Sequence, residues 1–242
     1  MRYLIVSDIH ANLAALQSVL DAAPSFDAIW CLGDLVGYGP NPNEVIERLQ
    51  EFPFVSVMGN HDWGVLGRAD PYIFNTDARH ALLWTRDELT AENQRFLAGL
   101  PVGQKVEDFV LVHASVREPI WEYLLDTNAA RKSFTFNNFR VALSGHTHIP
   151  VVFEWDESTA EARMSPPDWE EPLQLGGRRL IINAGSVGQP RDGDPRAAYG
   201  LLDTEARTFS FHRVAYAVEI TQERMRACGM PARLIERLEL GR

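Results

Sequence analysis

The sequence predicts an α/β (α+β) fold with a mixed β-sheet architecture. Short apolar runs alternate with helical patterns in the first half of the chain, which indicates parallel strands. The second half is richer in strands separated by glycine-containing turns, which favours antiparallel pairing. This mixture suggests two packed sheets with helices outside them, a four-layer β-sandwich flanked by helices. We expect residues 1–242 to form a single domain of this kind.

The elements of the first half follow from hydrophobic periodicity. Apolar runs predict buried strands at residues 2–7, 27–32 and 54–58. Helices are predicted between them at residues 12–22 and 42–50. In the first helix, three leucines recur at helical spacing, and a proline lies just beyond its end.

The remaining elements are assigned in the same way. The segment 76–99 is helical in pattern, with a second helix start at Thr90. A further helix is expected at 128–134, and the C-terminal helices at about 217–227 and 231–239. The remaining strands are expected at 102–106, 109–112, 140–143, 150–155, 178–183, 197–203 and 207–214. Residues 156–177, acidic and proline-bearing, are interpreted as a surface excursion that could contain a short strand.

Composition and charge narrow the class of protein. The formal net charge of −10 argues against general binding of nucleic acid, which needs a basic face. It leaves small phosphorylated substrates open, because a local metal site can reverse the sign of the local potential. Two cysteines do not make a disulfide framework, and no run of about 18 apolar residues predicts a membrane span. We therefore expect a cytoplasmic protein that does not bind membranes.

Polar side chains follow the predicted strands at the points where those strands end. Five of the seven histidines take part in this pattern. The residues concerned are Asp8, His10, Asp34, Asn60, His61, His113, His146 and His148. Because ligands bind at the carboxyl ends of strands in open α/β sheets, we expect these side chains to converge on one site.

The chemistry of this set predicts a metal centre. Carboxylate, amide and imidazole ligands without thiolate suit manganese, iron, cobalt, nickel or zinc. Seven of these eight residues, all but His61, are candidate ligands, a number that is about right for two ions sharing one bridging carboxylate. Such pairs of ions lie about 3.5–4 Å apart. Only two of the seven are carboxylates, so two divalent ions leave the cluster net positive, which suits a phosphate. We expect two divalent transition-metal ions, manganese first, with iron, nickel, cobalt or zinc as alternatives.

Five motifs in this sequence resemble those of the calcineurin-like metallophosphoesterase superfamily, in its small phosphodiesterase-type branch of bacteria and archaea. They occur in the family's order and cover roughly residues 1–150. The motifs are Asp8-Ile9-His10, Gly33-Asp34-Leu35-Val36-Gly37, Gly59-Asn60-His61-Asp62, Val112-His113-Ala114 and Gly145-His146-Thr147-His148. The run Asn183-Ala184-Gly185-Ser186 resembles a later glycine–serine loop and extends the match to about residue 190.

The resemblance implies a role for each matched residue. The ligands of the first metal are Asp8, His10 and His148. The ligands of the second metal are Asn60, His113 and His146. Asp34 bridges the two ions, and His61 is the catalytic histidine, with Asp62 orienting its ring. The implied reaction is hydrolysis of a phosphomonoester or phosphodiester by direct attack of a metal-bridging hydroxide, with His61 stabilising or protonating the leaving group.

Three further residues have two interpretations each. Asn12 either caps the first helix or contacts substrate, Tyr38 either packs or contacts substrate, and Arg191 either binds phosphate or lies in a surface loop. The function itself also has an alternative, since some proteins of this fold are non-catalytic protein-interaction scaffolds. Scaffold members typically lack the catalytic histidine, and this sequence keeps His61, which favours an enzyme. The physiological substrate and the oligomeric state cannot be read from the sequence, although a homo-oligomer is possible.

Overall fold

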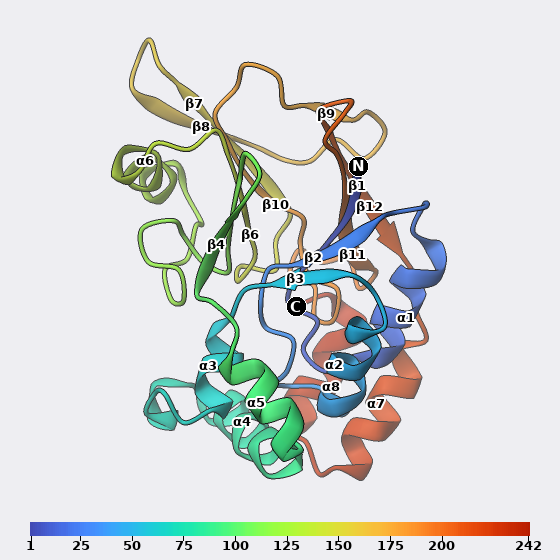
Figure 1. The fold of residues 1–242 in the computed structure, drawn as a ribbon. Helices are drawn as coiled ribbons and strands as arrows, with labels where there is room; N and C mark the ends of the chain where they lie inside the picture. Colours follow the sequence, from blue (N-terminus) through green and yellow to red (C-terminus); the bar gives the residue numbers. More distant parts are fainter.

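A computed structural model describes residues 1–242 and places two six-stranded sheets face to face (Figure 1). The first sheet has the strand order β3-β2-β1-β11-β12-β9. Its strands are β1 (Arg2–Val6), β2 (Ala28–Cys31), β3 (Phe54–Ser56), β9 (Leu173–Gln174), β11 (Ala197–Asp203) and β12 (Thr208–Val214). The strands β1, β2 and β3 are parallel to one another, whereas β11, β12 and β9 pair in antiparallel fashion.

The second sheet has the strand order β4-β5-β6-β10-β7-β8. Its strands are β4 (Gly103–Val106), β5 (Phe109–Val112), β6 (Val141–Ser144), β7 (Val151–Asp156), β8 (Glu161–Ser165) and β10 (Leu180–Asn183). Here β5, β6 and β10 are parallel. The strand β4 pairs antiparallel to β5, β7 antiparallel to β10, and β8 antiparallel to β7. Each sheet therefore contributes one block of three parallel strands.

Helices cover the outer faces of the sandwich and one of its ends. In Figure 1, α1 and α2 lie beside the first sheet, α6 beside the second, and α3, α4 and α5 gather at the end below the sheets. The helices are α1 (Leu13–Ala22), α2 (Pro42–Gln50), α3 (Asn60–Val65), α4 (Thr76–Glu88), α5 (Ala91–Ala98), α6 (Thr127–Phe136), α7 (Val218–Ala227) and α8 (Ala232–Leu240), with a 3₁₀ turn at Pro71–Ile73. No helix is both long and apolar enough to cross a membrane.

Alternation along β1 explains how the layers hold together. Tyr3 and Ile5 point into the core between the two sheets, while Leu4 and Val6 point into the core under α1 and α2. Successive side chains of a strand face opposite sides, so a central strand must be apolar on both. A third apolar cluster joins α6 to the outer face of the second sheet. The predicted four-layer architecture is thus confirmed.

Two segments differ from the sequence prediction. The short helix α3 follows β3 directly and was not predicted, because six residues are too few to show helical periodicity. The excursion at 156–177 contains two strands rather than one, β8 and β9. These strands lie at the edges of different sheets, so the excursion spans the open side of the sandwich.

Candidate metal centre

The predicted ligands converge where the two parallel blocks end. The Asp8 and Asp34 loops follow β1 and β2, and Asn60 is the first residue of α3, which follows β3. From the second sheet, His113 follows β5, and the loop with His146 and His148 follows β6. All seven side chains are buried, with no more than 6% of their surface exposed. The fold therefore brings together the residues that the sequence places after separate apolar runs.

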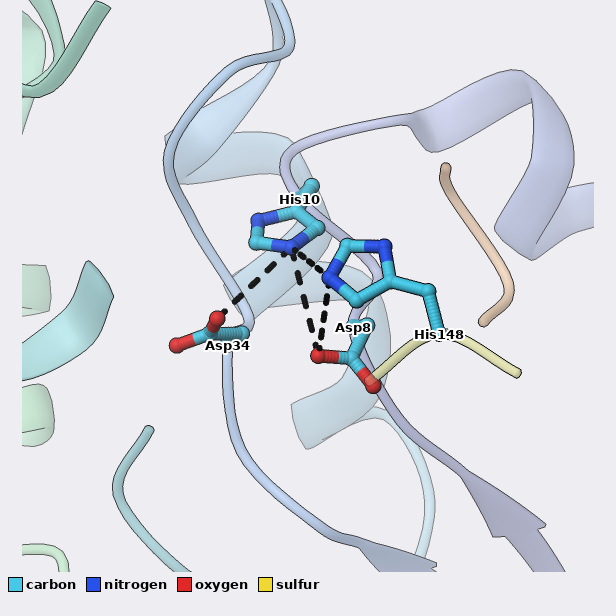
Figure 2. Close-up of side chains that lie close together, drawn as sticks. All are labelled: Asp8, His10, Asp34 and His148. Carbon is cyan, nitrogen blue, oxygen red and sulfur yellow. Dashed lines mark hydrogen bonds and ion pairs between the residues drawn. The ribbon is translucent and has the colours of Figure 1, made fainter. Parts of the chain in front are cut away.

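Four side chains form the first group of possible metal ligands, namely Asp8, His10, Asp34 and His148. Figure 2 shows their polar atoms pointing toward one another. His148 Nε2 lies 3.3 Å from Asp8 Oδ1 and 3.2 Å from His10 Nε2. His10 Nε2 lies 3.6 Å from Asp34 Oδ2. One ligand atom from each of the four lies within 4.8 Å of all the others, which is a spacing that a single cation can bridge.

A second group shares Asp34 with the first and adds His113 and His146. His113 Nε2 lies 3.4 Å from Asp34 Oδ2 and 3.2 Å from His146 Nδ1. Asn60 joins this group through its amide oxygen, which is 3.1 Å from His113 Nε2. Asp34 is therefore the one carboxylate that faces both groups.

In each ligand histidine, the ring nitrogen that points away from the other ligands shows how the ring fits a metal. His10, His113 and His148 place Nδ1 within 3.1 Å of a backbone carbonyl oxygen, and His146 places Nε2 3.3 Å from another. A carbonyl accepts only from an N–H, so this contact fixes the tautomer and leaves the opposite nitrogen as a lone-pair ligand. In His10 and His148 two such nitrogens face each other at 3.2 Å. A cation between them satisfies both lone pairs, so the donor set fits a metal.

The backbone of the centre is held in an unusual conformation. Positive φ angles between 49° and 65° occur at Asp8, His10, Asp34, His146 and His148. Residues with a Cβ visit this left-handed region rarely, at a cost of about 1–2 kcal/mol each. Such outliers persist only where the surroundings impose them, and they gather at functional sites. Five of the seven predicted ligands share this feature.

Burial and mutual charge shift the pKa values of the centre strongly. Burial raises the pKa of Asp8 to about 7. Burial also favours the neutral form of Asp34, but the imidazoles of His113 and His61 outweigh it and lower the Asp34 pKa well below its ordinary value. Burial lowers the pKa of His113, yet the Asp34 carboxylate outweighs burial and raises it to about 9. The buried carboxylates therefore favour positive charge at this centre, which a bound cation supplies.

His61 lies beside the ligands but forms part of neither group. Its ring is 4.9 Å from the His10 ring and 4.3 Å from the Tyr38 ring, centroid to centroid, and is 3% exposed. Burial lowers its pKa to about 4. Its Nδ1 has no hydrogen-bond partner. His61 is therefore a buried imidazole at the edge of the site that takes no part in either group of ligands.

Asp62 does not orient His61, and that expectation was wrong. Its carboxylate instead accepts hydrogen bonds from the backbone N–H groups of Gly59, Asp34 and Val36, at 2.9, 2.8 and 3.2 Å. The position of Asp62 in the first turn of α3 explains the difference. The carboxylate points back to the helix start, where N–H groups lack partners, rather than along the helix to the preceding side chain. Asp62 therefore holds the loop that carries Asp34.

The three residues with open interpretations lie at different depths. Asn12 is 1% exposed, caps α1 through the backbone N–H of Ala15, and donates to the carbonyl of Gly188. Its cap role is confirmed, and a contact with substrate stays a prediction. Tyr38 packs with its ring 4.7 Å from the His10 ring, and Arg191 places its guanidinium 5.9 Å from the Tyr38 ring. Both lie at the rim of the centre.

Comparison with known proteins identifies the family. Residues 1–207 match the model of the calcineurin-like phosphoesterase superfamily domain. The chain belongs to this superfamily. A metallophosphoesterase from Sphaerobacter thermophilus has a crystal structure that is similar over 100% of this chain and 99% of that one, with 43% identity and a TM-score of 0.91. The helices α7 and α8 lie beyond the matched segment.

Curated relatives of this calcineurin-like phosphoesterase include enzymes with named activities. An uncharacterised protein of Methanocaldococcus jannaschii is 38% identical, over 98% of this chain and 97% of that protein. The phosphodiesterase YfcE of Escherichia coli K12 is 27% identical, over 85% of this chain and 89% of that enzyme. The symmetrical bis(5'-nucleosyl)-tetraphosphatase of Paracidovorax citrulli is 33% identical, over 76% of this chain and 65% of that enzyme.

Sequence reasoning missed residues that act through their backbone or their rings. The carbonyls of Trp121 and Gln189 receive the ring N–H groups of His146 and His148. Tyr123 stacks on the His146 ring with centroids 3.9 Å apart. A backbone carbonyl carries no side-chain signature, so nothing in the sequence could reveal the first two. The aromatic residues of 121–123 offered the only signal.

Replacing Gly37 by alanine should displace His61 without removing metal. A Cβ at Gly37 would lie 2.6 Å from His61 Nδ1, and the backbone there has φ +89°. We expect a loss of about 1–2 kcal/mol in stability from the left-handed backbone and a fall in kcat of about tenfold or more from the moved ring.

Gly67→Ala is the matched control for this variant. Gly67 has φ +71°, but nothing lies within 4 Å of its Cβ position. The same loss of stability should appear in its thermal unfolding, while phosphoesterase activity stays at the wild-type level. Equal activity in the two variants would show that the contact between Gly37 and His61 has no part in turnover.

Proposed function

We propose that this chain is a dinuclear metal-dependent hydrolase of phosphoester bonds, acting on monoesters or diesters. The observation that carries the proposal is the position of Asp34, whose carboxylate faces both groups of ligands. A shared carboxylate is the feature that distinguishes a pair of coupled ions from two separate sites. Once bound, two divalent ions supply positive charge that activates water and stabilises both oxygens of an in-line displacement.

The residues of the chain have separate tasks in this proposal. Asp8, His10 and His148 hold the first ion, Asn60, His113 and His146 hold the second, and Asp34 bridges them. The backbone carbonyls behind the four histidines keep the ring orientations fixed, so no reorganisation is needed when substrate binds. The support for these tasks is the convergence of one polar atom from each side chain.

His61 acts on the leaving group. Its ring lies beside the ligands and can donate a proton or a hydrogen bond to the oxygen that departs from phosphorus. The ring is neutral at pH 7 in the free protein, because burial lowers its pKa to about 4. The negative charge of a bound phosphate favours the protonated form, whereas the positive charge of the bound ions opposes it.

A non-catalytic scaffold on the same fold is the alternative function. His61 is buried beside the ligands, and the backbone of the centre is strained. Both features are typical of catalytic sites and therefore favour an enzyme over a scaffold. The relatives named phosphodiesterase and tetraphosphatase support an enzyme as well.

Colour release from p-nitrophenyl phosphate and from bis-p-nitrophenyl phosphate tests the proposal. We expect the purified chain to hold two ions per molecule and to hydrolyse at least one of these substrates when Mn²⁺ is added. Dialysis against a chelator should abolish turnover, and Mn²⁺ should restore it. Full loading with metal and no turnover on a broad panel of phosphoesters would instead support the scaffold.

A further inference from the structure

An arginine-lined pocket of about 470 Å³ lies next to the candidate metal centre. Its volume falls in the range of small-molecule sites, about 300–1,000 Å³. Three arginines line it, namely Arg191 from the loop after β10 and Arg233 and Arg237 from α8. Asp77 is the one acidic residue in its lining. On a chain with a net charge of −10, this pocket is a local exception, with three positive side chains against one negative.

None of the pocket arginines forms an ion pair with an Asp or Glu side chain, whereas several arginines elsewhere in the molecule do. Arg178, for example, binds both oxygens of Glu154 at 2.7 Å. In the pocket, Arg191 donates to the side-chain carbonyl of Gln189, and its Nε has no partner. Arg237 donates through Nε to the main-chain oxygen of Arg242, and no hydrogen bond or ion pair involves the Arg233 side chain. Each of these guanidinium groups therefore keeps N–H groups that can bind an anion.

Crowding of positive charge is costly unless an anion offsets it. Burial and the neighbouring guanidinium of Arg191 lower the pKa of Arg237 to about 10. The first turn of α4, with Asn75 and Thr76 in the lining, adds backbone N–H groups that have no partner within the helix. Guanidinium forks and helix N-termini are the groups that proteins use to bind phosphate.

Aromatic rings make one wall shared by the pocket and the metal centre. Tyr38 lines the pocket, and its ring is 4.3 Å from the His61 ring and 4.7 Å from the His10 ring. Tyr123 also lines the pocket and stacks on His146 at 3.9 Å. One small molecule can therefore reach from the metal ligands past these tyrosines to the arginines.

We propose that the pocket binds a second phosphate group of the substrate, so that the preferred substrates are small phosphoesters with at least one further phosphate beyond the bond that is cleaved. This inference rests on the proposed function, because it takes hydrolysis at the metal centre as given. It also assigns a task to α8, which lies outside the segment shared with the family domain. The C-terminal helix α8 then determines which substrates bind, and the residues of the shared family domain carry out the hydrolysis.

A double variant, Arg233→Ala with Arg237→Ala, tests the pocket in two measurements. The first is calorimetric binding of inorganic tripolyphosphate to the full chain after removal of metal, which needs no turnover. We expect the double variant to lose about 100-fold in affinity, tenfold for each charge-assisted contact. Arg226→Ala is the control, because it removes one exposed positive charge from α7 outside the pocket. It should bind tripolyphosphate as the wild type does.

The second measurement compares two substrates with Mn²⁺ present. We expect the double variant to lose about 100-fold in kcat/KM for bis(5'-adenosyl) tetraphosphate, mainly through KM, and less than threefold for p-nitrophenyl phosphate. Unchanged tripolyphosphate binding, or equal losses on both substrates, would overturn the role of the pocket while leaving the hydrolase intact. Wild-type binding of tripolyphosphate without hydrolysis of any substrate would instead overturn the proposed function. Circular dichroism of each variant shows whether α8 stays folded.

Discussion

Asp34→Asn should remove both metal ions and lower kcat by about 10⁴-fold. The substitution keeps the size of the side chain but replaces its charge, and Asp34 is the one carboxylate within reach of both ligand groups. Its Oδ2 lies 3.6 Å from His10 Nε2 and 3.4 Å from His113 Nε2. Loss of the bridge leaves one carboxylate, Asp8, for two divalent ions. A loss of several kcal/mol in transition-state stabilisation follows, at 1.36 kcal/mol per tenfold in rate.

Metal content by mass spectrometry and turnover of bis-p-nitrophenyl phosphate measure this effect. Asp156→Asn is the control, since Asp156 lies at the end of β7 and pairs with Arg163 far from the centre in the fold. That variant should keep two ions and full activity. If Asp34→Asn also kept two ions per chain, the carboxylate would not be a bridge, and the two ligand groups would have to bind metal independently.

The convergence of these side chains could be predicted from the sequence because it depends on strand ends. An apolar run followed by Asp8, or by His113, places that side chain at the carboxyl edge of a sheet, whatever the details of the fold. The parallel pairing of β1 with β2 and of β5 with β6 then brings separate motifs together. The hydrophobic periodicity of the strands and the short motifs that follow them are local signals, so both are visible in a single sequence.

What the sequence could not show depends on contacts between distant segments. The Asp62 carboxylate was expected to face the adjacent histidine, yet it binds the N–H of Asp34, 28 positions away. The pocket is a second example, because Arg233 and Arg237 meet Arg191 only after α8 packs against α4 and α7. Along the chain, these arginines look like ordinary exposed positions of an amphipathic helix.

His61→Ala should lower kcat by about 10²–10⁴-fold while both metal ions stay bound. The ring belongs to neither ligand group, and its Nδ1 has no partner whose loss would disturb the ligands. The cavity that alanine leaves is bordered by the rings of Tyr38 and Phe74, at 4.3 and 5.2 Å between centroids, so some loss of stability should accompany the loss of activity. His80→Ala, at an exposed position of α4, is the matched histidine control and should leave both quantities unchanged.

The leaving group separates a catalytic role of His61 from a structural one. Nitrophenolate departs without a proton, whereas an alkoxide needs one, so an acid matters more for alkyl phosphodiesters than for nitrophenyl esters. We therefore expect His61→Ala to lose at least tenfold more activity on an alkyl ester than on bis-p-nitrophenyl phosphate. A ring that only filled space or positioned the metals would affect both substrates equally. Equal losses, or loss of metal together with activity, would place His61 among the structural residues of the centre and remove the feature that most favours an enzyme over a scaffold.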